Sequence, residues 1–119
     1  MRRLTKNFTE LELQCPCCGD VAMDRAFMEE LQKVRSACDF PFRVNSGYRC
    51  EKHNAIVSKN SMNDHTEGLA VDIHCNDRNK RARFLMHLLV NSYFKDIAIA
   101  KTFIHIGKGR SHQGLGVYG

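Results

Sequence analysis

The sequence predicts an α+β fold with a small antiparallel sheet and flanking helices. Helical periodicity covers residues 24–38 and 77–94, whereas short runs at 42–46, 69–75 and 102–106 alternate between apolar and polar residues as strands do. The two kinds of element do not alternate regularly, as they would in a parallel α/β fold. At 119 residues the chain is long enough for one hydrophobic core, so we expect a single domain spanning residues 1–119.

The N-terminal third is expected to form an extended arm followed by a long helix. Within the arm, residues 9–12 can make one helical turn, and three apolar residues are expected to tuck under the core: Phe8, Leu11 and Leu13. The helix should start after Asp24, a suitable N-cap, and end before Pro41, which excludes helical backbone at the preceding residue. Its apolar stripe recurs at intervals of four, three and four residues: Phe27, Leu31, Val34 and Cys38.

The rest of the chain alternates between short elements. A strand over residues 42–46 should end at Gly47, and a short helix should run from Cys50 to about Val57. A strand over 69–75 leads into a helix that Asn76 or Asp77 can cap and that extends to about Phe94. The expected apolar stripe of that helix is Ala82, Leu85, Leu88, Leu89 and Tyr93. Strands at 97–100 and 102–106 follow, and the glycine-rich tail, 107–119, is expected to be a loop.

The charge balance favours anionic partners without choosing among them. The chain has 18 Lys plus Arg and 13 Asp plus Glu, which gives a net charge of +5. Nucleic acid, phospholipid and a phosphate-bearing cell wall all fit this bias. No segment has the roughly 20 apolar residues of a membrane span. The basic N-terminus lacks a following apolar segment, so we expect no signal peptide, synthesis in the cytoplasm, and release by another factor if the protein acts outside.

One stretch concentrates residues suited to chemistry. His65 precedes Asp72 by seven positions with Gly68 between them, and Asp72 lies inside an alternating apolar strand. A carboxylate there costs several kcal/mol unless it is paired, solvated or bound to a metal. A second strand carries His105 among apolar neighbours. Two imidazoles and one carboxylate form the ligand set of a catalytic zinc ion that keeps its fourth position open.

Six cysteines require a separate explanation. Cys15-Pro16-Cys17-Cys18 is similar to half of a zinc knuckle, but the chain has no second Cys-x-x-Cys to supply the other half. Without an expected signal peptide, a disulfide framework is not the default. We therefore favour small buried or loop thiols, with a structural metal as the alternative.

Four segments together resemble a known family. They are Phe8 to Cys18; Asn45-Ser46-Gly47-Tyr48-Arg49 followed by His53-Asn54; His65-x-x-Gly68-x-Ala70-x-Asp72-Ile73; and Phe103-Ile104-His105-Ile106. In this order they resemble the zinc peptidases that cut peptidoglycan stem peptides: D-Ala-D-Ala carboxypeptidases, D,D-dipeptidases and phage L-alanyl-D-glutamate endolysins. The short single-domain branch is the most similar, and the Hedgehog signalling domain shares that fold.

This resemblance implies a cofactor, a reaction and residue roles. Zn²⁺ would be bound by the three residues already selected, His65, Asp72 and His105. Arg49 would face the cleft and bind a substrate carboxylate or stabilise the oxyanion formed during amide hydrolysis. Ser46 and Tyr48 are candidates for substrate binding. The implied protein is a monomer that acts on peptidoglycan peptides, with neither a nucleic-acid partner nor a membrane span.

The general base is where this chain departs from the family pattern. Thr102 stands where several branches have an acid three positions before the last zinc histidine, and Gly107 stands where short-branch members often have an aspartate two positions after it. Other groups must then accept the proton of the attacking water. Our candidate catalytic residues are Glu67 and His112, with Asp64 and His74 as further candidates.

Three functions follow from these observations. The first is a zinc peptidase of peptidoglycan, encoded by a phage or prophage. The second, suggested by the missing acid near His105, is an inactive zinc module of the same fold that binds cell wall or serves phage assembly. The third is a nucleic-acid-binding protein with a cysteine zinc site. The unpaired cysteine motif and an aromatic content of 8% disfavour the third.

Overall fold

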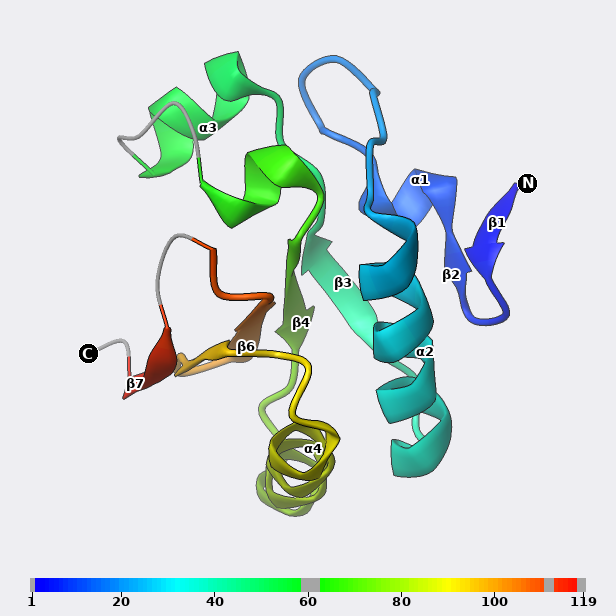
Figure 1. Ribbon diagram of the computed structural model, residues 1–119, viewed down its shortest axis with the longest axis vertical. Coiled ribbons are helices and arrows are strands. Elements are labelled where there is room, and N and C mark those ends of the chain that lie inside the picture. The colour runs from blue at the N-terminus through cyan, green and yellow to red at the C-terminus, as the bar shows by residue number, and fades with distance from the viewer. Residues whose placement is uncertain (1, 59–62, 111–112, 118–119) are drawn as a thin grey trace.

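The computed structural model describes residues 2–58, 63–110 and 113–117, and it confirms the α+β class (Figure 1). Strands β3 (Arg43–Ser46), β4 (Ala70–His74), β6 (Phe103–Gly107) and β5 (Asp96–Ile99) pair antiparallel in that order. Helices α2 (Arg25–Cys38) and α4 (Arg78–Asn91) contact each other and pack against the sheet. No helix in the described part of the chain combines the length and the apolar character needed to cross a bilayer.

Helix α2 follows the predicted pattern. The Asp24 carboxylate accepts a hydrogen bond from the backbone N–H of Phe27 and caps the first turn. Asp39 ends the helix in left-handed backbone, two residues before Pro41. All four predicted stripe residues are buried: Phe27, Leu31, Val34 and Cys38.

Helix α4 occurs where it was predicted, and Leu85, Leu88 and Tyr93 of its predicted stripe contact the core, but the rest of the stripe and the end of the helix were predicted wrongly. Phe84 and Leu88 are fully buried, whereas Ala82 and Leu89 of the predicted stripe are exposed. Phe84 is buried because its ring packs against two other aromatic rings, with centroids 4.5 Å from that of Phe42 and 6.4 Å from that of Phe40. The helix ends at Asn91 because Ser92 adopts left-handed backbone, φ 62°.

Arg81 fixes how α4 lies on the sheet. Its guanidinium donates hydrogen bonds to three backbone carbonyls, those of Cys75, Ala100 and Lys101. The first lies just after β4 and the other two lie in the turn between β5 and β6. One side chain therefore ties the helix to the end of β4 and to the β5–β6 turn, and it satisfies carbonyls that lie outside the strand ladder.

The central strands separate a core face from a polar face. Val71 and Ile73 on β4 pair with Ile106 and Ile104 on β6, and all four are fully buried with the helices. Because side chains alternate along a strand, the intervening residues of both strands point away from the helices. The polar residues of the candidate site lie on that second face.

The N-terminal arm is extended with one helical turn, as predicted, whereas the C-terminal tail differs from prediction. In the arm, strands β1 (Arg3–Thr5) and β2 (Phe8–Thr9) form a hairpin, and α1 (Glu10–Leu13) begins with a capping box between Thr9 and Glu12. Phe8 and Leu13 are buried as predicted, but Leu11 is exposed. In the tail, β7 (Gly114–Val117) pairs parallel with β5 where a loop was predicted, which makes the sheet mixed at that edge.

Candidate metal centre

Three side chains converge on the polar face of the sheet. Asp72 on β4 lies directly opposite His105 on β6, and the Asp72 Oδ1 to His105 Nδ1 distance is 2.7 Å. His65 reaches the same carboxylate from a 3₁₀ helix, η1 (Asp64–Glu67), with its Nε2 3.6 Å from Asp72 Oδ1. One ligand atom from each residue lies within 4.8 Å of the others. We call these three residues the His–Asp–His triad.

His65 has one nitrogen with a partner and one without. Its Nδ1 lies 2.8 Å from the Gly47 carbonyl oxygen, which can only accept, so Nδ1 carries the proton. Its Nε2 then presents a lone pair, and this atom is buried without a hydrogen-bond partner. An orphaned lone pair at a buried position costs free energy unless a cation binds it.

The turn around Gly68 holds His65 in place. Gly68 ends η1 in left-handed backbone, φ 70°, and its N–H donates to the Asp64 and His65 carbonyls. Its own carbonyl accepts a hydrogen bond from the N–H of Asp24, so η1 is anchored to the start of α2. A Cβ at position 68 would overlap the Ala22 carbonyl oxygen, and only glycine fits this approach.

His105 lies between two carboxylates. Its Nε2 is 3.2 Å from Asp96 Oδ2, and its Nδ1 faces Asp72. Burial lowers the pKa of the His105 imidazole, but the Asp72 and Asp96 carboxylates outweigh burial and raise that pKa above its ordinary value. For the Asp72 carboxyl, burial acts in the opposite direction and raises the pKa. The hydrogen bond with His105 and the proximity of His65 outweigh burial and hold the Asp72 pKa below its usual range. The site therefore favours a positive charge beside the Asp72 carboxylate.

The donor set fits zinc. A carboxylate oxygen, an unpartnered imidazole Nε2 and an imidazole Nδ1 are the atom types that bind catalytic Zn²⁺. The second nitrogen of each imidazole is hydrogen-bonded to an oxygen, Gly47 O for His65 and Asp96 Oδ2 for His105. Such contacts fix the tautomer and aim the other nitrogen at the metal.

Arg49 borders the same carboxylate. Its Nη2 is 3.6 Å from Asp72 Oδ2, its Nε donates to Ser46 Oγ at 3.1 Å, and its Nη1 donates to the Oδ1 of buried Asn54 at 3.2 Å. A surface groove of about 380 Å³ opens here. The groove's lining includes Arg49, Ser46 and Asp72 together with Glu12 and Pro16 from the N-terminal segment. Asp72 is the member of the triad that lines the groove, so the groove brings a guanidinium beside this candidate metal ligand.

The candidate general bases and Tyr48 each have their own contacts in the structure. The Glu67 carboxylate pairs with Arg110, Oε2 to Nη1 2.8 Å, and Asp64 is buried, where its Oδ2 accepts from the N–H groups of Gly109 and Arg110. His74 shares the face of Asp72 but lies opposite Phe103. His112 lies outside the described residues. The Tyr48 backbone N–H donates to the Leu13 carbonyl at 2.9 Å, and burial raises the pKa of its phenol.

Sequence reasoning missed Asp96. Gly107 has no carboxylate, but Asp96 is its direct partner on β5, and a Cβ at position 107 would lie 3.5 Å from Asp96 Oδ2. The Oδ2 atom of Asp64, a predicted candidate base, lies 3.1 Å from the same Cβ position, so two carboxylates lie beside Gly107 and near His105. The β5–β6 hairpin turns at residues 100–103 and pairs Asp96 with Gly107, but the strand expected at 97–100 left Asp96 out, so the sequence pattern did not reveal this pair.

The comparison with known families agrees with this geometry. The model of the family described as Peptidase M15 matches residues 6–107, a range that contains the whole triad, Arg49 and Asp96. No curated protein sequence matches the chain. Since the family match covers most of the 119 residues, the chain belongs to the peptidase M15 family of zinc-dependent metallopeptidases.

Proposed function

We propose that this protein is a zinc peptidase that hydrolyses amide bonds in peptidoglycan stem peptides or cross-links, and that the His–Asp–His triad binds its zinc. The observation that supports this most strongly is the buried, unpartnered Nε2 of His65, which is directed at the Asp72 carboxylate from 3.6 Å. A structural histidine would bond both nitrogens or expose one to water. Membership of the M15 family supports the same function.

The residues around the triad have distinct proposed roles. When bound, zinc would polarise the scissile carbonyl and make water more acidic. Asp96 is a positioning residue that accepts the Nε2 proton of His105 and leaves Nδ1 free to act as a ligand. Arg49, held by Ser46 and Asn54, carries a positive charge at the groove, where it binds a substrate carboxylate or stabilises the developing oxyanion.

The peptidoglycan substrate is proposed on two grounds. Four sequence segments resemble peptidases of the cell wall, including the Ser46-Gly47-Tyr48-Arg49 segment beside the groove. The net charge of +5 also favours binding to an anionic wall. We propose that the protein acts there as a monomer, as a phage or prophage lysin released to the wall after synthesis.

Purified peptidoglycan of several wall types provides the test. We expect the zinc-loaded protein to release new amino groups, and we expect His65→Ala to abolish this release and to lose zinc from the triad. His87→Ala is the matched control, because His87 lies on α4 rather than in the triad. Zinc bound at the triad without cleavage of any wall type would refute the peptidase proposal.

An inactive wall-binding module is the second candidate, favoured by Gly107 in place of an acid. It predicts zinc binding and wall binding without turnover. A pull-down with insoluble peptidoglycan separates the two candidates. Retention that survives Arg49→Ala, together with no release of amino groups, supports the binding module. Loss of both retention and cleavage in Arg49→Ala supports the peptidase.

A further inference from the structure

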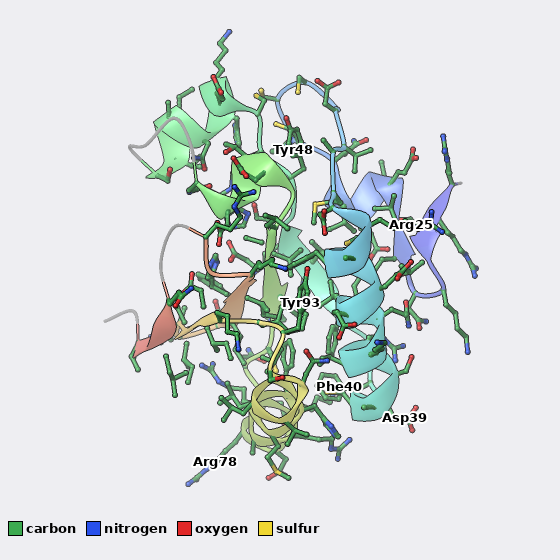
Figure 2. All side chains as sticks on the ribbon, in the orientation of Figure 1. Arg25, Asp39, Phe40, Tyr48, Arg78 and Tyr93 are labelled. Atoms are coloured by element: carbon green, nitrogen blue, oxygen red, sulfur yellow. The ribbon has the colours of Figure 1, made fainter. Side chains whose placement is uncertain are left out.

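Four thiols gather at the end of the molecule where the loop before α2 faces helix α3 (Glu51–Ser58). Yellow sulfur atoms are visible there beside Tyr48 (Figure 2). All four sulfur atoms lie within 4.8 Å of one another, although their residues are up to 35 positions apart. We call these residues the cysteine cluster: Cys15, Cys17, Cys18 and Cys50.

The sulfur distances match coordination of one metal ion rather than disulfides. Cys15 Sγ lies 3.8 Å from Cys17 Sγ and 3.7 Å from Cys50 Sγ, and Cys17 Sγ lies 3.3 Å from Cys50 Sγ. Four thiolates at about 2.3 Å from a tetrahedral zinc ion lie about 3.8 Å from one another. A disulfide requires about 2.05 Å, and all the cysteines are free.

Backbone N–H groups favour the thiolate form of two members of the cluster, Cys15 and Cys50. The N–H of Cys50 points at Cys15 Sγ and the N–H of His53, in the first turn of α3, points at Cys50 Sγ, both at 3.4 Å. A helix N-terminus favours negative charge and therefore the thiolate form. The loop closes through Gly19, whose N–H donates to the Cys15 carbonyl at 2.8 Å and whose φ is 77°.

We propose that the cysteine cluster binds a structural zinc ion, separate from the metal of the His–Asp–His triad. Four thiols would lose their protons and bind one Zn²⁺ as a closed tetrathiolate, without a position left for substrate or water. Cys50 supplies the ligand that a second Cys-x-x-Cys pair would otherwise provide, which is why the sequence pattern alone looked incomplete.

This ion would cross-link two walls of the groove. Cys50 directly follows Arg49, and Pro16 lies between two cysteines of the loop, while both Arg49 and Pro16 line the groove. The N-terminal segment also meets this region through the hydrogen bond from Tyr48 N–H to the Leu13 carbonyl and through the close approach of Leu13 to Gly47. Zinc therefore holds the Cys15–Cys18 loop against the strand end that presents Arg49.

The test measures zinc bound per chain, by elemental mass spectrometry, in the wild type, two variants and one control variant. We expect two ions in the wild type, one in His65→Ala and one in the double variant Cys17→Ser/Cys18→Ser. Cys17 and Cys18 are exposed, so the double variant leaves the core intact. Cys75→Ala is the matched control, because Cys75 is buried in the core outside the cluster, and it should retain both ions.

Cobalt provides a second measurement on the unmodified chain. Wild-type protein loaded with Co²⁺ should show intense sulfur-to-cobalt charge-transfer absorption that Cys17→Ser/Cys18→Ser removes and His65→Ala retains. Absence of that absorption, unchanged zinc content in the cysteine double variant, or loss of titratable thiols to a disulfide would each overturn the proposal. A wild type with one ion that only the cysteine variant loses would support the cluster while refuting zinc at the triad.

Discussion

The substitution Gly68→Ala tests how η1 is positioned against the start of α2. Gly68 combines two constraints: left-handed backbone, φ 70°, and a Cβ position that overlaps the Ala22 carbonyl oxygen and lies 2.8 Å from Met23 Cα. Two other glycines separate these constraints. Gly19 has φ 77° and open space around its Cβ position, whereas a Cβ at Gly47 would lie 2.8 Å from the Leu13 carbonyl oxygen without requiring positive φ.

The expected costs follow from this separation. Placing alanine in left-handed backbone costs about 1 kcal/mol. We expect Gly19→Ala to lower the free energy of unfolding by this amount alone. Forcing backbone apart costs about 1–3 kcal/mol, which is the expectation for Gly47→Ala. Gly68→Ala incurs both, or about 2–4 kcal/mol, and should lower Tm by roughly 10 °C in a chain of this length.

Urea unfolding followed by circular dichroism, in zinc-saturated buffer, measures the three free energies of unfolding. Gly68→Ala should also weaken zinc binding at the triad, because His65 lies three residues before the displaced turn. If Gly68→Ala destabilises the protein no more than Gly19→Ala does, the close approach of η1 to Ala22 is wrong, and so is the account of how His65 is held.

Three further outcomes are expected. Asp96→Ala should weaken zinc binding at the triad by roughly 10–100-fold, measured by competition with a chelator, and an unchanged affinity would contradict the positioning role. In chelator-treated protein, the raised pKa of His105 stabilises the folded state fully below about pH 6.5, and this stabilisation is lost as the pH rises through the folded-state pKa. The variant His105→Gln should lack this component of the pH dependence of the free energy of unfolding. Identical pH profiles for the two proteins would refute it. Phe84→Ala should cost about 3–5 kcal/mol in urea unfolding and Leu89→Ala less than about 0.5 kcal/mol, whereas comparable costs would contradict the buried face of α4.

The elements were predictable wherever one local pattern dominated. Helix α2 has a single apolar stripe and a capping aspartate, and β4 alternates over its whole length, so both followed from sequence. Helix α4 carries apolar residues on several faces, and only aromatic packing with Phe40 and Phe42 selects Phe84. Strand β7 has no buried residue, so its pairing with β5 had no hydrophobic pattern to reveal it.

The same distinction applies to the sites. The triad could be selected from sequence because a polar residue in an apolar strand is conspicuous, and the structure brings its three members together. Asp96 lies at the first position of β5, where an acid is unremarkable until the register with Gly107 is known. The cysteine cluster forms because Cys50 approaches the loop that carries Cys18, 32 positions earlier in the chain. Only the tertiary structure reveals that approach.

The pairing of β4 with β6 also guards against misalignment. Asp72 faces His105 only in the register that pairs Ile73 with Ile104 and Val71 with Ile106. A slip of one residue on either strand would exchange its two faces, sending isoleucines into water and a ligand into the helices, at roughly 1.5–3 kcal/mol for each large apolar side chain exposed. Burial of the apolar face thereby fixes the register that brings the polar ligands together. A misaligned chain is less stable even before a metal ion binds.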